Sequence, residues 1–354
     1  MDISRGLEGV IVDTTRISLV DGVNGVLSYR GSNVENLIDK PFGHVAGLVV
    51  DGECSAALSE SLRAASTLSE RETDLICALP ESTHPMHVLQ GVTPLLDATE
   101  HFAERGDAAQ GFAVAAKLPS ILATCLLRRQ PDTSTVGDPA ERFLRQIGAP
   151  DSAIAREAYN VTQILQIEHS FNASTFVARA TASTLAPVEN ALSAAFGTLH
   201  GRLHGAADQA ALETADQVGR PECAAAFVDK CLANKIKVMG MGHREYRVLD
   251  PRARHLKTLA ESLCSGTEHE LTYRTLVAIE ARFIERMAAD GKSLYANLEF
   301  YKGVIYRTLG LPDRFFTANF ALARVFGYLA HFIESREDNR LVRPKAHYIG
   351  PAIA

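Results

Sequence analysis

The stretch MGMGHREYRVLDPRARHLK, which begins at position 239, holds the densest group of residues able to bind a small anion. Gly240 and Gly242 lack a Cβ, so the backbone there can come close to a ligand while His243 points into a cleft. Arg247 and Arg252 follow, and a guanidinium makes bidentate, charge-assisted contacts with phosphate or carboxylate groups. The alternative is that these arginines are solvated surface charge. The spacing is not the GxGxxG of a dinucleotide-binding βαβ unit.

Two further segments place histidines beside helix ends. In IEHSFNASTF, His169 and Asn172 are three apart at a helix end, so an imidazole and an amide can face one ligand. The alternative is that this histidine is a helix cap or a solvated residue. In GTLHGRLHGAADQAAL, His200 and His204 precede a helix expected from Gly205, whose N-terminal dipole favours a neutral His204 that donates a hydrogen bond. Zinc is the rival hypothesis for this pair. Because HExxH is absent and glycines interrupt the helix, we expect no metal site.

An acidic residue and two arginines follow further along the chain. In YANLEFYKGVIYRTLGLP, Glu299 lies in apolar company, which disfavours the charged carboxylate and raises its basicity toward what proton abstraction requires. Arg324 lies on the otherwise apolar face of the helix ALARVFGYLAHFIE and needs an anion there. Arg343 follows in NRLVRPKAHY.

The composition indicates a globular protein. The chain has 354 residues, is 46% hydrophobic and carries a net charge of −6 with both signs interspersed, so no basic stripe points to nucleic acid. Six cysteines without CxxC spacing favour a reducing cytoplasm over a zinc site or a disulfide framework. The N-terminus does not resemble a signal peptide. The longest apolar stretch, residues 111–127, is broken by Lys117 and Pro119 and is shorter than a membrane span.

Hydrophobic periodicity predicts a mostly α-helical protein with one short β-hairpin near its start. β-branched residues flank Asp21-Gly22 and Asn24-Gly25, a signal typical of a hairpin. After residue 30, apolar residues recur at spacings of three and four. The predicted helices span 55–67, 69–79, 85–100, 107–130, 138–148, 152–170, 173–199, 205–218, 222–235, 251–265, 270–290, 298–309 and 313–336.

Several predicted helices have recognisable ends. Ser69 leads Glu72 as a capping box, and Pro251 occupies a first-turn position. Predicted helix stops fall at Gly148, Gly219 and Gly310. The helix predicted over 173–199 is dominated by Ala, Ser and Thr, which suits a central helix, a subunit interface or an ordinary Ala-rich helix.

Taken in order, these segments resemble the citrate synthase family, which includes the 2-methylcitrate synthases. The segments are NASTF, LHG, GMGHREYRVLDPRA, ANLEFY and RVFGYLAHFIE. The resemblance covers nearly the whole chain, from GLEGVIVDTTRISLVDGVNGVLSYRG to NRLVRPKAHYIGP.

The resemblance implies a multi-helical homodimer in which each subunit has two domains that close over a cleft. The small domain would be residues 206–310, and the large domain residues 1–205 and 311–354. The implied reaction condenses a short acyl-CoA with oxaloacetate and hydrolyses the resulting citryl-CoA thioester. It needs no metal and no resident cofactor, since acetyl-CoA is a co-substrate, and no nucleic acid or membrane is an expected partner.

The resemblance also implies roles for the residues singled out above. His204 would hydrogen-bond the thioester carbonyl as it becomes an enol or enolate, His243 would polarise the oxaloacetate ketone, and Glu299 would remove the α-proton. The remaining roles concern binding: His169, Asn172, Arg252 and Arg324 would hold oxaloacetate together with Arg343 of the partner subunit, and Arg247 would contact a CoA phosphate.

The sequence departs from the family pattern around two catalytic positions. The base is usually Asp in a PNVDFY context, and here Ala296, Leu298 and Glu299 replace Pro, Val and Asp. Glu also occurs at this position in some family members. GRLHGAADQ differs from the common GPLHGGANE at Arg202, Ala206, Asp208 and Gln209. These departures bear on the turnover rate and on the preferred acyl group.

Three functions therefore follow as hypotheses. The first is a citrate synthase that uses acetyl-CoA and oxaloacetate. The second is a 2-methylcitrate synthase that uses propionyl-CoA. The third is a catalytically weak paralogue that binds oxaloacetate or citrate and has a regulatory role, motivated by Glu299 and the altered loop around His204.

Overall fold

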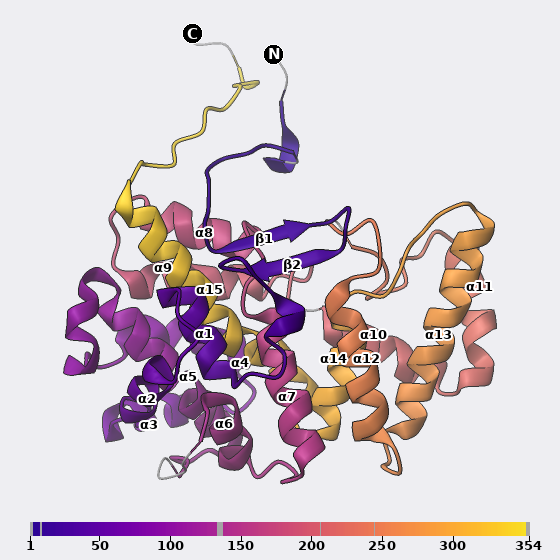
Figure 1. Cartoon of the computed structure of the whole chain (residues 1–354), viewed down its shortest axis with the longest axis horizontal. Helices are drawn as coiled ribbons and strands as arrows, with labels where there is room; N and C mark the ends of the chain where they lie inside the picture. The colour runs from indigo at the N-terminus through magenta and orange to yellow at the C-terminus, as the bar shows by residue number, and fades with distance from the viewer. Residues whose placement is uncertain (1–2, 8, 133–136, 206, 244, 352–354) are drawn as a thin grey trace.

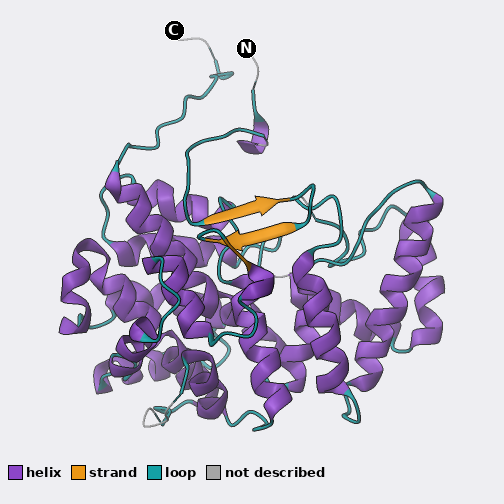
Figure 2. Cartoon of the chain, viewed as in Figure 1, coloured by secondary structure: helices purple, strands orange, loops and turns teal. Residues whose placement is uncertain are grey.

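The computed structural model describes residues 3–7, 9–132, 137–205, 207–243 and 245–351. Over these ranges the chain is mostly helical, with one small antiparallel sheet near its start (Figure 2). The predicted mostly α class with a short N-terminal hairpin is confirmed. Ala206, one of the departures from the family pattern, and Arg244, next to His243, fall outside the described residues.

The sheet is the predicted hairpin with a short third strand. Strand β1 (Ser18–Asp21) pairs with β2 (Val26–Tyr29), and β3 (Ser32–Asn33) pairs with the end of β2. The Asp21 carboxylate accepts hydrogen bonds from the backbone N–H groups of Val23 and Asn24 at 3.0 and 2.9 Å, which closes the turn. The turn is thus held by the aspartate of the Asp21-Gly22 pair that predicted the hairpin.

The larger group of helices surrounds α15 (Phe316–Glu337), whose side chains from Phe316 to Phe332 are all buried. Helices α1, α5, α7, α8 and α9 contact it (Figure 1). Their bounds and those of the remaining members are α1 Phe42–Asp51, α2 Ala57–Ala64, α3 Glu70–Ala78, α4 Pro85–Val92, α5 Ala109–Leu127, α6 Pro139–Ile147, α7 Ala153–Gln166, α8 Ala173–Ala182 and α9 Val188–Leu199.

The other helices gather on one side of the molecule, at the right of Figure 1. They are α10 Ala207–Val218, α11 Ala224–Ala233, α12 Pro251–Cys264, α13 Glu270–Ala289 and α14 Glu299–Thr308. Contacts of α12 and α14 with α7 join this group to the rest of the fold. The predicted small domain of residues 206–310 stays a prediction, because it concerns motion as well as position.

Several predicted helix ends are confirmed. Ser69 and Glu72 form a reciprocal capping box, and Pro251 opens α12 behind Asp250, whose side chain caps the helix. The three predicted stop glycines all have positive φ. Because this region of conformational space is open to glycine at little cost, these residues end helices where other residues would be strained.

Three predicted helices are wrong by four residues or more, and one helix was missed. The segment 152–170 ends as α7 at Gln166, so His169 lies in a loop. The segment 173–199 is two helices, because Pro187 disfavours helical backbone at the preceding residue and α9 begins only after it. The segment 85–100 ends as α4 at Val92, and a short 3-10 turn containing Pro94 follows. Helix α1 escaped prediction because eight of its ten residues are buried, which leaves no polar face to mark a period.

The helical stretch Glu100–Leu127 is long and apolar enough to cross a membrane by length and composition alone. This differs from the sequence expectation, because a 3-10 helix (Glu100–Ala108) precedes α5 and lengthens the segment. Within the fold, 83% of its most apolar window is buried by the rest of the protein. The core helix of a globular fold has the same properties.

Candidate active site

The loop that carries His169 follows α7 and is fixed by the β-hairpin. The Tyr29 hydroxyl donates to the carbonyl oxygens of Ile164 and Glu168 at 3.0 and 3.3 Å. Ser18 donates its hydroxyl to the Glu168 carboxylate at 3.0 Å and accepts from the backbone N–H of Ser170 at 3.1 Å. Both neighbours of His169 are therefore held, which orients the imidazole between them.

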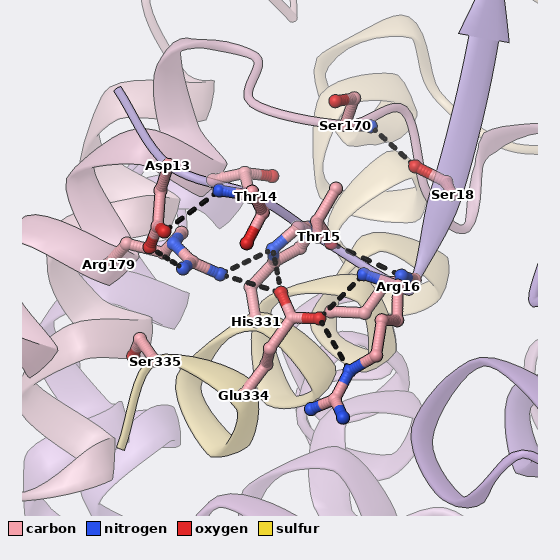
Figure 3. A network of polar contacts seen from close by, with 12 residues as sticks. Asp13, Thr14, Thr15, Arg16, Ser18, Ser170, Arg179, His331, Glu334 and Ser335 are labelled. Carbon is pink, nitrogen blue, oxygen red and sulfur yellow. Dashed lines mark hydrogen bonds and ion pairs between the residues drawn. The ribbon is translucent and has the colours of Figure 1, made fainter. Parts of the chain in front are cut away.

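A buried polar network continues behind this loop (Figure 3). His331 and Glu168 are fully buried and lie 3.0 Å apart, Nε2 to Oε1. Arg179 donates to Nδ1 of His331 at 3.2 Å, so Nε2 carries the imidazole proton and donates it to Glu168. Burial alone would raise the pKa of Glu168, but His331 beside it holds that pKa below the ordinary value. Glu168 is therefore a fixed anion directly before His169.

The same network anchors the N-terminal segment (Figure 3). Arg179 pairs with Glu334 at 2.9 Å and also with Asp13. The backbone N–H of Arg16 donates to Glu334 at 2.7 Å. The segment before β1 is thus tied to α8 and α15 close to the His169 loop.

His243 is oriented by its own loop. Its Nδ1 accepts hydrogen bonds from the backbone N–H groups of Glu245 and Tyr246 at 3.0 and 3.2 Å, so the neutral ring carries its proton on Nε2. That Nε2 lies 3.3 Å from a terminal nitrogen of Arg252. Both groups are donors in this arrangement. An oxygen that accepts from both, such as a ketone or carboxylate oxygen, matches the pair.

Arg252 is buried in the first turn of α12 and held by Asp250 before it. Two guanidinium nitrogens donate to the two Asp250 carboxylate oxygens, each at 2.9 Å. Burial opposes the charge on Arg252, but this bidentate pair raises the pKa of the guanidinium above its ordinary value. Asp250 also accepts from the backbone N–H of Leu298 at 3.2 Å, which connects the loop of His243 to the start of α14.

His169, His243 and Tyr246 meet ring to ring. The ring centroid of His169 lies 5.5 Å from that of His243 and 5.7 Å from that of Tyr246. The pKa of His169 lies well below its ordinary value, chiefly because of burial and then because of Arg252, His243 and Arg324. Burial, with Arg252, lowers the pKa of His243 to about 4. Both imidazoles are therefore neutral hydrogen-bonding groups at neutral pH.

A short backbone bridge connects His243 with Glu299. Gly242 donates to the Tyr295 carbonyl oxygen at 2.7 Å, and Asn297 donates to that of Gly240 at 3.0 Å. The expectation that Gly240 admits a ligand is wrong, because a Cβ at this residue would lie 2.7 Å from the ring of Phe300. The absence of a side chain at Gly240 therefore allows the Phe300 ring to pack against the backbone.

His204 lies in the segment between α9 and α10. Its Nε2 is 2.7 Å from Oγ of Ser174, which accepts from the Tyr328 hydroxyl at 2.7 Å. The single proton of Ser174 goes either to the Asn172 amide oxygen, 2.8 Å away, or to Nε2 of His204, and in the second arrangement the neutral imidazole carries its own proton on Nδ1. Burial, with Arg324 and Lys302, lowers the pKa of His204 to about 4.

Arg324 influences both His169 and His204. Its Nε donates to the Gln166 carbonyl oxygen at 2.8 Å, and its guanidinium carbon lies 4.6 Å from the centre of the Phe320 ring. The side chain is only 2% exposed, and its positive charge acts on both His169 and His204. The predicted buried arginine on α15 is therefore close enough to both histidines to lower their pKa values.

Glu299 opens α14 and has a neighbour that the sequence analysis missed. Lys302, three residues later and without solvent exposure, places its ammonium 2.5 Å from Oε2 of Glu299 and 3.3 Å from Oδ2 of Asp208. The spacing of three on a helix was the available signal. Such a pair normally lies on a helix surface, and the sequence did not show that this one is buried.

The structure leaves three predicted binding residues apart from this group. The Asn172 side-chain oxygen caps α8 by accepting from the backbone N–H of Thr175 at 3.1 Å, and it lies 2.8 Å from Oγ of Ser174. Arg247 is exposed at the edge of the loop. Arg343 is exposed on the extended C-terminal segment, which leaves the body of the molecule (Figure 1). The binding roles of all three stay predictions.

The other histidine of the LHG region, His200, packs elsewhere. Its ring stacks on that of His84 with 4.4 Å between centroids and meets His87 edge-on at 4.8 Å. Within the described ranges, no group of three or more His, Cys, Asp or Glu side chains has the geometry to hold a metal ion.

Comparison with known proteins agrees with this geometry. The family profile described as "Citrate synthase, C-terminal domain" matches residues 6–345. The chain is 36% identical to the citrate synthase of Synechocystis, over 98% of its own length and 90% of that protein. The match and the helical fold with its histidine- and arginine-lined site establish that the chain belongs to the citrate synthase family of enzymes.

Two further relatives bear on the reaction. The chain is 35% identical to a 2-methylcitrate synthase of Shewanella oneidensis, over 98% of its own length and 94% of that protein. Its fold matches, with a TM-score of 0.88 and 28% identity, a citrate synthase of Thermoplasma acidophilum solved as a ternary complex with carboxymethyl coenzyme A and oxaloacetate. That match covers 100% of this chain and 97% of the other.

Proposed function

We propose that this enzyme condenses acetyl-CoA with oxaloacetate and hydrolyses the product thioester to citrate and free CoA. The observation that carries the proposal is the convergence of His169, His243, Arg252 and Arg324 on one volume, where buried donors outnumber acceptors. A small dicarboxylic keto acid supplies the acceptors that these groups match. No metal or resident cofactor is part of the proposal.

The proposed reaction begins at the acyl methyl group. Glu299 takes a proton from the α-carbon, and the electrons of that C–H bond move toward the thioester oxygen. His204 donates a hydrogen bond from Nδ1 to this oxygen as negative charge develops on it. Stabilising such charge with a preorganised donor is often the largest contribution to catalysis.

The carbon nucleophile then attacks the ketone carbon of oxaloacetate. A C–C bond forms, the ketone C=O opens, and the oxygen takes a proton from Nε2 of His243. Arg252 and Arg324 hold the carboxylates throughout, with His169. Water next adds to the thioester, CoA leaves as the thiol, and the acyl carbon becomes a carboxylate.

The test is a thiol-release assay with purified protein. Release of free CoA from acetyl-CoA should require oxaloacetate. A matched series with propionyl-CoA separates the citrate and 2-methylcitrate reactions by their kcat/KM values. If neither acetyl-CoA nor propionyl-CoA releases free CoA in an oxaloacetate-dependent way, the proposal is overturned and the regulatory paralogue is the alternative.

The proposal includes a homodimer in which Arg343 of the partner subunit completes the oxaloacetate site. It is supported by the exposed, extended segment that carries this residue. A small domain of residues 206–310 that closes on the substrate and a reducing cytoplasm as the compartment belong to the same proposal. The cytoplasmic compartment is supported by the six cysteines, which are all free thiols.

Light scattering would measure the molar mass and so the number of subunits. Mixing the variants R343A and H243A would test whether the site is shared between subunits. Co-assembled dimers should regain activity, because one of the two sites then receives both native residues. Failure to regain activity in verified mixed dimers would contradict the shared site.

A further inference from the structure

Lys302 is held from three sides by oxygen atoms. Its ammonium nitrogen lies 2.5 Å from Oε2 of Glu299 in the same helix and 3.3 Å from Oδ2 of Asp208 in α10. It also donates to Oε1 of Gln166 at the end of α7, at 3.3 Å. An ammonium has three donors. The contact with Gln166 is a hydrogen bond, and the two carboxylate contacts are ion pairs, so the ammonium meets an oxygen from each of three helices.

The remaining surroundings of Lys302 are tightly packed. Its nitrogen lies 4.2 Å from the centre of the Phe320 ring, which also contacts Arg324. A Cβ at the next residue, Gly303, would lie 2.9 Å from the carbonyl oxygen of Asp208, so α14 and α10 pack with no space between them. The fully buried ammonium is thus a fixed point rather than a mobile charge.

The charges around Lys302 are not balanced one to one. Asp208 is fully buried, and Glu299 has a side chain that is only 13% exposed. One cation therefore serves two carboxylates. Burial and the charge of Glu299 raise the pKa of Asp208 to about 6, against the opposing effect of Lys302. The other ionisable groups near this set are Tyr306 of α14, His204 and Arg324.

This imbalance matters for a base. A lone ammonium beside Glu299 would stabilise the ionised carboxylate and reduce its tendency to accept a proton. A second carboxylate on the same ammonium offsets that effect while the ammonium still fixes the position of Glu299. Fixing is useful here, because a glutamate has one more rotatable bond than the aspartate usual at this position.

We propose that Lys302 is a positioning residue for the Glu299 carboxylate and that Asp208 offsets the ammonium charge so that Glu299 still accepts a proton. The inference rests on the proposed function, in which Glu299 removes the acyl α-proton. It adds two residues to that step, neither of which touches the substrate.

The experiment compares the full-length variants K302M, D208N and K302M/D208N with the wild type by kcat, KM and the pH profile of kcat. K302M should lower kcat about 10- to 100-fold, because a misplacement near 1 Å costs about that much. The KM for oxaloacetate should change less than about threefold, because the groups that hold this substrate are untouched.

The pH profile separates positioning from simple loss of structure. Without the cation, the ionised carboxylate is less stabilised, so the acidic limb of kcat should move to higher pH in K302M. In D208N it should move to lower pH, and in the double variant it should return toward that of the wild type. The double variant also carries no unpaired buried lysine, so it keeps the test possible if K302M fails to fold.

K117M is the matched control, because Lys117 is a buried lysine paired with Glu72 in α3 and lies outside the site. Its kcat per folded molecule should equal that of the wild type. The inference is overturned if K302M keeps kcat within twofold and an unchanged pH profile, or if K117M lowers kcat equally. An inactive wild type would overturn the proposed function as well, which distinguishes the two failures.

Discussion

Lys117 in α5 and Lys302 in α14 are both buried lysines beside buried carboxylates, but their surroundings differ. Lys117 lies 2.7 Å from Glu72, whose oxygens also accept from the backbone N–H groups of Ser69 and Asp97, each at 2.8 Å. Lys302 serves two carboxylates, and the nearer oxygen of each makes an ion pair without an aligned hydrogen bond. The first pair is saturated, whereas the second keeps oxygen atoms able to accept a proton.

The same residue types therefore serve different purposes in the two places. A saturated one-to-one pair contributes to the fold because removing either partner leaves a buried charge unmatched. A set with an excess of carboxylate is a poor structural element, because an additional negative charge is held in a medium of low polarity. Such a set is expected where a proton must be accepted.

The largest expected effect is on catalysis, from E299Q. Removing a general base costs typically 10²- to 10⁴-fold, so we expect kcat to fall about 1,000-fold. The stability should hold or rise, because the substitution removes one of two carboxylates that share one cation. Thiol release and urea unfolding measure the two effects. A variant that keeps a tenth of the wild-type kcat would show that another group removes the proton.

The next largest effect is on stability, from K117M. This change leaves Glu72 buried without its cation, so the free energy of unfolding should fall by about 3–5 kcal/mol. Urea unfolding monitored by circular dichroism measures it. E72Q is the companion variant, because it leaves Lys117 as the unmatched charge and should also destabilise. A loss below about 1 kcal/mol in both would mean that the pair is not a structural element.

The smallest effect is a pH dependence that D208N should remove. The pKa of Asp208 is raised to about 6 from 3.8, so the folded state binds the proton more tightly than the unfolded state. This contribution to stability is present at low pH and is lost as pH rises through about 6. Relative to the wild type, D208N should therefore gain about 2–3 kcal/mol between pH 4 and 7. Parallel stability curves for the two proteins would contradict this assignment.

Sequence reasoning succeeded where a residue type was unusual for its local pattern. An arginine on an otherwise apolar helix face predicted that Arg324 is buried. It failed where the signal was ordinary. Glu299 and Lys302 have the spacing of a common surface ion pair. The sequence therefore did not indicate that Lys302 is buried, because its burial depends on the packing of α10 and α7 against α14.

Segment boundaries show the same limit. Helix α1 has no polar face, so its periodicity was lost, although its burial against α15 makes it part of the core. The glycine at position 240 was interpreted as space for a ligand, and the structure fills that space with Phe300. In both places the missing information was the identity of the neighbour, which is set by distant parts of the chain.

The hairpin that holds the His169 loop also reaches the loop of His243. The backbone N–H of Arg247 donates to the carbonyl oxygen of Gly22 at 2.8 Å, and a Cβ at Gly22 would lie 2.0 Å from the carbonyl oxygen of Glu245. A single methyl group at the hairpin tip would therefore push the hairpin and the loop of His243 apart. The spacing between the hairpin and the loop of His243 is therefore set by a residue with no side chain.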